Sequence, residues 1–99
     1  EGIPDGAAID EEGCYWSAMF DGWRIARFSP TGEQLAEYRL PVRCPTMVCF
    51  GGADRRTLFI TTTRENMSAA EVAQYPLSGA IFTLPVEVAG MKKLSFIER

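Results

Sequence analysis

The first forty residues alternate between apolar and polar positions in the way that β-strands do. Residues 14–20 are apolar on both faces, so this segment is expected to lie between two other layers of structure. Residues 7–9, 23–28 and 34–40 form further strand-like runs, and the last of them alternates like an outer strand. Acidic, Asp-Gly and Ser-Pro-Thr-Gly segments separate the runs. The pattern predicts four strands in succession.

The second half of the chain predicts another set of strands, interrupted by a helix. Residues 46–50, 57–63 and 80–84 are rich in β-branched and aromatic side chains, and residues 92–97 form a weaker run. Between them, Ser68 followed by Glu71 has the spacing of a capping box. A short helical insert near residues 68–75 is therefore expected.

The two halves resemble each other. When Tyr15-Trp16 is aligned with Leu58-Phe59, the repeat is about 43 residues long, which is within the range of a propeller blade. An isolated antiparallel sandwich and a piece of a barrel remain as alternatives. Two blades alone would leave apolar faces uncovered. The chain is therefore expected to be a piece of a larger ring or to associate with other copies.

Composition and charge exclude several classes of function. The 99 residues are 46% hydrophobic with a formal net charge of -3, so no basic stripe for nucleic acid or for anionic membranes is expected. No apolar run approaches the ~18 residues of a membrane span. The chain begins without methionine, and we expect a fragment.

Cysteine and histidine usage narrows the chemistry further. The sequence has three cysteines, no Cys-x-x-Cys spacing and no histidine, which argues against a zinc-finger site, a disulfide framework and a Ser-His-Asp triad. Cys14, Cys44 and Cys49 each lie in an apolar run. They are expected to be small buried residues of a protein of the reducing cytoplasm.

Local patterns leave the acidic residues without a special role. Asp5 before Gly6 is a common turn pair, in which the carboxylate bonds to its own backbone. The run at residues 10–12 lacks the spacing of a calcium loop, so a solvated turn is expected. The arginine pair at 55–56 is likewise expected in a solvated turn. Met47 and the tryptophans Trp16 and Trp23 are expected to pack in the core.

Four motifs, in order and covering nearly the whole chain, resemble the gluconolactonase, regucalcin and senescence-marker-protein family. They are Pro4-Asp5-Gly6 continued to Trp16, Leu40-Pro41-Val42 continued to Phe50-Gly51-Gly52, Leu58-Phe59-Ile60-Thr61-Thr62, and Ser78-Gly79-Ala80-Ile81-Phe82. Residues 91–99 match no feature of the family.

The resemblance implies an all-β fold, a six-bladed β-propeller of which this chain forms the two C-terminal blades. Blade one would span about residues 5–40 and blade two about 44–97. The implied reaction is hydrolysis of a sugar lactone to its aldonic acid, with a divalent metal in the central channel: Ca²⁺ or Zn²⁺, or else Mn²⁺ or Mg²⁺. Asp5 would be one of three metal ligands and the general base. The other ligands, a Glu and an Asn, and the substrate contacts would lie upstream, so no substrate-binding residue is assigned here.

Three functions fit this resemblance. The first is a metal-dependent lactonase acting on a gluconolactone or arabinolactone type of substrate. The second is a non-catalytic calcium-binding protein of the same fold, and the third is a propeller used as a platform for protein interactions. The fragment by itself is expected to be inactive and to self-associate through its open sheet edges.

Overall fold

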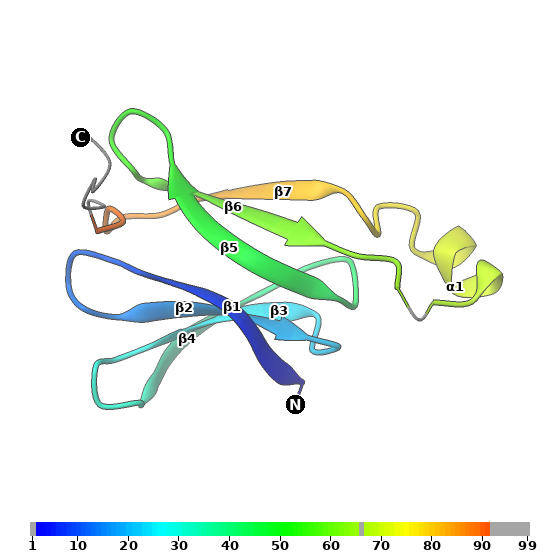
Figure 1. The fold of residues 1–99 in the computed structure, drawn as a ribbon, viewed down its shortest axis with the longest axis horizontal. Coiled ribbons are helices and arrows are strands. Elements are labelled where there is room, and N and C mark those ends of the chain that lie inside the picture. Colours follow the sequence, from blue (N-terminus) through cyan, green and yellow to red (C-terminus); the bar gives the residue numbers. More distant parts are fainter. Residues whose placement is uncertain (1, 66, 92–99) are drawn as a thin grey trace, which may run out of the picture.

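The computed structural model describes residues 2–65 and 67–91, which form two antiparallel β-sheets and one short helix (Figure 1). The first sheet has the order β1 (Ile3–Ile9), β2 (Tyr15–Phe20), β3 (Arg24–Phe28), β4 (Gln34–Arg39). The second has the order β5 (Pro45–Gly51), β6 (Thr57–Thr62), β7 (Ile81–Pro85). Within each sheet, consecutive strands are neighbours and antiparallel, so the predicted all-β class is confirmed.

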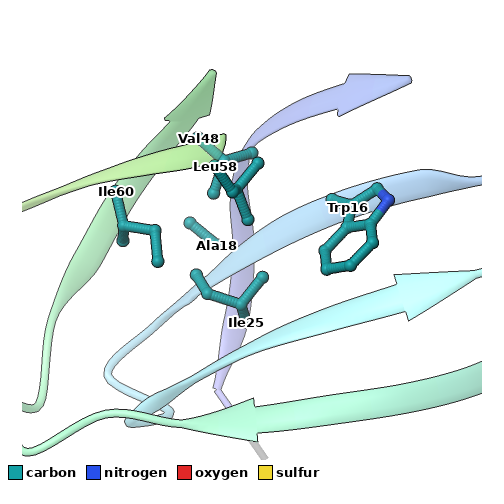
Figure 2. Close-up of a cluster of buried hydrophobic side chains, with 6 residues drawn as sticks. All are labelled: Trp16, Ala18, Ile25, Val48, Leu58 and Ile60. Carbon is teal, nitrogen blue, oxygen red and sulfur yellow. The ribbon is translucent and has the colours of Figure 1, made fainter. Parts of the chain in front are cut away.

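The core lies between the two sheets, where the inward-facing side chains of each meet. Figure 2 shows this cluster, which consists of Trp16, Ala18 and Ile25 from the first sheet and Val48, Leu58 and Ile60 from the second. Cross-strand pairing explains the grouping, because Ala18 is opposite Ile25 and Val48 is opposite Ile60. Full burial of one such aliphatic side chain contributes about 1.5–3 kcal/mol, so this cluster holds the sheets together.

The internal repeat inferred from the sequence is compatible with the burial of its residues. Trp16 and Leu58 are both buried in the core between the sheets, whereas Tyr15 and Phe59 are 41% and 38% exposed. Repeated units that stack side by side meet through opposite faces, so the face that the first sheet turns to the second corresponds to the face that the second sheet turns away from the first. Trp16 and Phe59 lie on these corresponding faces, and their alignment stays a prediction.

The helical insert is present, as the capping box indicates. Helix α1 (Ala69–Gln74) begins after Ser68, whose Oγ accepts a hydrogen bond of 3.1 Å from the Glu71 amide. The Glu71 carboxylate accepts one of 3.4 Å from the Ser68 amide. Such a cap contributes about 1 kcal/mol. Within the described residues, no helix is long and apolar enough to cross a membrane.

The end of the second sheet is described only in part. The strand predicted over residues 92–97 lies outside the described residues. Within the described part of the chain, β7 pairs with β6 alone and forms an edge of the sheet. After β7 the chain crosses back to the first sheet, where Gly90 forms a bridge with Asp10.

The cysteines only partly follow the prediction. All three are free; Cys14 and Cys44 are buried, but Cys49 is exposed. Cys49 follows the core residue Val48 on β5, so strand alternation places its side chain on the opposite face of the sheet, away from the core. The expectation of a buried Cys49 is therefore wrong.

Candidate functional site

The Pro4-Asp5-Gly6 segment lies inside strand β1, not in a turn that precedes it. Pro4 is opposite Met19 and Ala7 is opposite Ser17, so Asp5 and Gly6 together oppose the one residue between these partners. This is a β-bulge, which bends a strand and redirects a side chain. The predicted turn is wrong because the strand starts earlier, at Ile3. Pro4 is tolerated there because β1 is an edge strand.

Gly6 is required by a close contact, not by an unusual backbone angle. It is not among the residues with positive φ. A Cβ atom at Gly6 would lie 2.8 Å from the backbone oxygen of Thr46 and would overlap the Met47 Sδ. The glycine therefore lets β1 approach β5 of the other sheet.

Asp5 itself is exposed on β1. Within the described residues its carboxylate forms no hydrogen bond or ion pair, so the turn contact to its own backbone is absent. No group of three or more potential metal ligands is found in that part of the chain either. Asp5 is thus an uncommitted carboxylate at a bulge, which could serve as one ligand of a metal but cannot complete a site from the described residues.

A groove with a volume of about 630 Å³ runs between β1 and β5. Its walls are formed by residues 7–9 of β1 and residues 47–50 of β5, with Arg55 and Met91 nearby. Met47 is 49% exposed there, so the expectation that it packs in the core is wrong. Its side chain lies against Gly6 and therefore borders the bulge that carries Asp5.

At the other end of β1, Asp10 is fully buried, although a solvated turn was predicted. Its Oδ2 accepts hydrogen bonds from the Trp16 indole at 2.9 Å and from the Arg27 Nη2 and Nε at 2.8 and 3.0 Å. Its Oδ1 accepts bonds from the amides of Glu12 and Cys14 at 2.9 and 3.0 Å. The carboxylate is thus surrounded by donors, which is what a buried charge requires.

These hydrogen bonds control the ionisation of the pair. Burial on its own would raise the pKa of Asp10, but hydrogen bonds from Trp16, Arg27 and the two backbone amides outweigh it, so this pKa lies below its usual value. Burial on its own would lower the pKa of Arg27, yet its hydrogen bonds to Asp10 and Glu12 raise it. The pairing of β2 with β3 explains why both donors reach Asp10, because Trp16 and Arg27 lie directly opposite each other.

The segment around Asp10 also joins the two sheets. The Glu11 amide donates to the Ala89 oxygen and the Met91 amide to the Ile9 oxygen, each at 2.9 Å. The Arg55 guanidinium donates to the Gly90 oxygen and forms an ion pair with Glu11, again at 2.9 Å. The turns at residues 10–12 and 55–56 therefore make contacts between sheets, beyond the solvated turns that were predicted.

The two tryptophans have different surroundings. Trp16 is buried, as predicted, and stacks on Tyr38 with ring centroids 5.5 Å apart. Trp23 is only half-buried; it contacts Tyr75, next to helix α1, edge to face at 4.8 Å. Only Trp16 belongs to the core between the sheets.

Comparisons with known proteins place this geometry in a family. The family model described as "SMP-30/Gluconolactonase/LRE-like region" matches residues 1–64. A 6-deoxy-6-sulfogluconolactonase from Pseudomonas putida is 61% identical over 89 residues, which cover 90% of this chain and 31% of that protein. A regucalcin from Danio rerio is 45% identical over 83 residues, which cover 83% of this chain and 28% of the relative.

A solved structure has the same arrangement of strands. The calcium-binding protein regucalcin from Agrobacterium tumefaciens superposes with a TM-score of 0.86 at 30% identity, over 91% of this chain and 30% of that one. The chain thus spans about a third of the length of the proteins that it matches. Both sheets take part in the match. The chain therefore belongs to the SMP-30/gluconolactonase/LRE-like family.

Proposed function

We propose that this chain forms two of the six blades of a β-propeller and that the intact protein is a metal-dependent sugar lactonase. The first sheet would belong to a blade of about residues 5–40 and the second to a blade of about 44–97. The observation that carries the proposal is Asp5, an exposed carboxylate without a partner at a bulge of an edge strand. The 61% identity to a named lactonase supports the reaction class.

Asp5 would supply one ligand of a divalent metal: Ca²⁺ or Zn²⁺, or else Mn²⁺ or Mg²⁺. Hard cations take carboxylate oxygens, and Asp5 has both of its oxygens available. The remaining ligands would come from other blades, since the described residues contain no group of three or more potential metal ligands. When bound, the metal would polarise the lactone carbonyl and lower the pKa of a water.

The chemistry assigned to Asp5 is that of a general base. Its carboxylate would take a proton from the attacking water, whose oxygen forms a bond to the lactone carbonyl carbon. The ring C–O bond then breaks, and the proton passes to the departing ring oxygen, which becomes the hydroxyl of the aldonic acid. The bulge fits this role because it holds the side chain out of the strand pairing.

A second candidate is calcium binding without catalysis. The solved structure with a TM-score of 0.86 is described as a calcium-binding protein, and this favours the candidate. Asp5 would remain a ligand, but no lactone would be hydrolysed. We further propose a cytoplasmic location and a small sugar lactone as the ligand, with no part in nucleic-acid or membrane binding. The buried free thiols of Cys14 and Cys44 support the reducing compartment.

The test is an assay of the intact protein, freed of metal and then supplied with each of the four cations. Gluconolactone, arabinolactone and 6-deoxy-6-sulfogluconolactone serve as substrates. Asp5→Asn should lower kcat by about 100-fold or more, because general-base catalysis contributes on the order of 10²–10⁴. Asp54→Asn, in the exposed turn after β5, is the matched control. Full activity of Asp5→Asn would disprove the proposed role, and metal binding without turnover would favour the second candidate.

A chimera tests the assignment of the blades independently. The matching third of the Pseudomonas putida lactonase is replaced by residues 1–91 of this chain. Because the two segments are 61% identical, the sheets should pack against the remaining blades and activity should be retained. A folded chimera that binds its metal but has lost all activity would contradict the assignment.

A further inference from the structure

Arg43, in the connection between β4 and β5, contacts two separate parts of the chain. Its Nε lies 2.9 Å from Oδ1 of Asp21, in the turn between β2 and β3. Its Nη1 lies 2.5 Å from Oε2 of Glu71, in the first turn of α1. Its backbone oxygen accepts a hydrogen bond of 3.1 Å from the Trp23 amide. One residue thus connects the turn between β2 and β3 with the helical insert.

The turn that Arg43 contacts needs such support. Asp21 and Trp23 both have left-handed backbone angles, with φ of 66° and 60°. A residue other than glycine in this region costs on the order of 1 kcal/mol and persists only where its surroundings hold it. Arg43 holds the turn from one side through Asp21, and Tyr75 holds it from the other by its ring contact with Trp23. Tyr75 is the C-cap residue of α1, so the helix takes part directly.

The same turn supports the start of β1, which carries Asp5. A Cβ atom at Gly2 would lie 2.7 Å from the Cα of Gly22, so the two backbones touch. Ile3 then pairs with Phe20, the last residue of β2. A movement of the turn would therefore be passed to Ile3 and to the bulge at Asp5. The helix, the turn and the first residues of β1 lie at the same end of the sheets (Figure 1).

We propose that Arg43 is a positioning residue for Asp5, and that α1 acts on Asp5 through Arg43. This inference rests on the function proposed above for Asp5. A guanidinium is suited to the task because it is planar and presents several donors in fixed directions, so it can bind Asp21 and Glu71 at once. A lysine at this position could reach only one of them well.

The experiment uses the intact protein with the substitutions Arg43→Lys and Glu71→Gln. Glutamine preserves the capping box while it removes the charge that Arg43 contacts. Arg43→Lys should weaken the binding of Ca²⁺, measured by titration calorimetry, and should lower kcat, each by about tenfold, because small displacements at a site have large effects. KM for the lactone should change less than twofold. Glu71→Gln should act in the same direction but more weakly.

Arg55→Lys is the matched control. Arg55 also forms an ion pair between the two sheets, with Glu11, but at the opposite end of β1 from Asp5. Its substitution should lower the melting temperature about as much as Arg43→Lys does, with Ca²⁺ affinity and kcat unchanged. If Arg43→Lys retains both values within twofold, or if Arg55→Lys lowers them equally, the positioning role is disproved.

Hydrogen exchange separates this inference from the proposed function. If the wild-type protein bound no metal and hydrolysed no lactone, the proposed function would fail. The link from Arg43 to β1 would then be judged by the backbone amides of Ile3 and of residues 5–7. Arg43→Lys should accelerate their exchange, whereas Arg55→Lys should not. Unchanged exchange at these amides, with faster exchange in α1 alone, overturns the inference.

Discussion

The Oδ2 of Asp10 lies 2.8 Å from the Nη2 of Arg27, and the two residues are 17 positions apart in the sequence. Arg27 also lies over the Trp16 ring, with its guanidinium carbon 5.6 Å from the centroid. The carboxylate is fully buried, and the arginine side chain is 16% exposed. The pair therefore closes the end of β1 opposite to Asp5, next to the segment that joins the two sheets.

Arg27→Met should destabilise the intact protein by about 3–5 kcal/mol, because it leaves the charge of Asp10 buried without its partner. Urea denaturation measures the free energy of unfolding. Arg56→Met, at an exposed position, is the control and should change stability by less than about 0.5 kcal/mol. Adding Asp10→Asn to Arg27→Met should cost less than the sum of the single changes. Additive costs would show that the two groups are not coupled.

Stability should fall as the pH is lowered below about 4. The pKa of Asp10 in the folded protein lies below its ordinary value of 3.8, so the ionised form stabilises the fold. This contribution is fully present above pH 3.8 and is lost as the pH falls through the lower, folded-state pKa. Denaturation of wild type and Asp10→Asn, over roughly pH 2–7, measures this contribution of Asp10 to stability. A parallel pH dependence of the two proteins would contradict the assignment to Asp10.

Gly6→Ala should lower stability by about 1–3 kcal/mol, because the added methyl group would overlap β5. The displacement of β1 should also weaken Ca²⁺ binding if Asp5 is a ligand. Ala7→Ser, at the next and exposed position of the same strand, is the control and should change neither quantity much. Thermal unfolding and calorimetric titration give the two readouts. A Gly6→Ala protein as stable as wild type would show that the strands separate easily.

The 99-residue chain on its own should self-associate. Met47, Ile81 and Phe59 are 49%, 67% and 38% exposed, and they lie on the face of the second sheet that points away from the core. Ile81→Lys should shift the chain toward monomer, because a charge opposes burial of this face. Thr31→Lys, in the turn after β3, is the control. Light scattering over a range of concentrations measures the oligomeric state, and a monomeric wild-type chain would contradict the prediction.

Much of the local structure follows from the sequence. The alternation of residues 34–40 predicts the edge strand β4, and Ser68 with Glu71 predicts the start of α1. Both signals act over a few residues, so neighbours in the chain suffice to produce them. The repeat is harder to interpret from burial alone, because the two sheets meet through opposite faces, so the aligned residues Trp16 and Phe59 differ in exposure.

The candidate site, too, follows partly from the sequence and partly from the tertiary structure. The sequence singles out Asp5 through the motifs of its family, whereas its place at a bulge depends on pairing with β2. The burial of Asp10 depends on Arg27 across the sheet, and the fit of Gly6 depends on Met47 in the other sheet.

The sequence by itself determined the strand order, the helical insert and the family, because periodicity, capping and motifs are local or directly visible in the chain. Only the tertiary structure decided that Asp10 is a buried ion-pair partner and that Arg43 connects the turn at Asp21 with helix α1. The physical reason is that a charge is buried or exposed according to the donors that folding brings around it. Those donors come from strands and turns that the sequence keeps far apart.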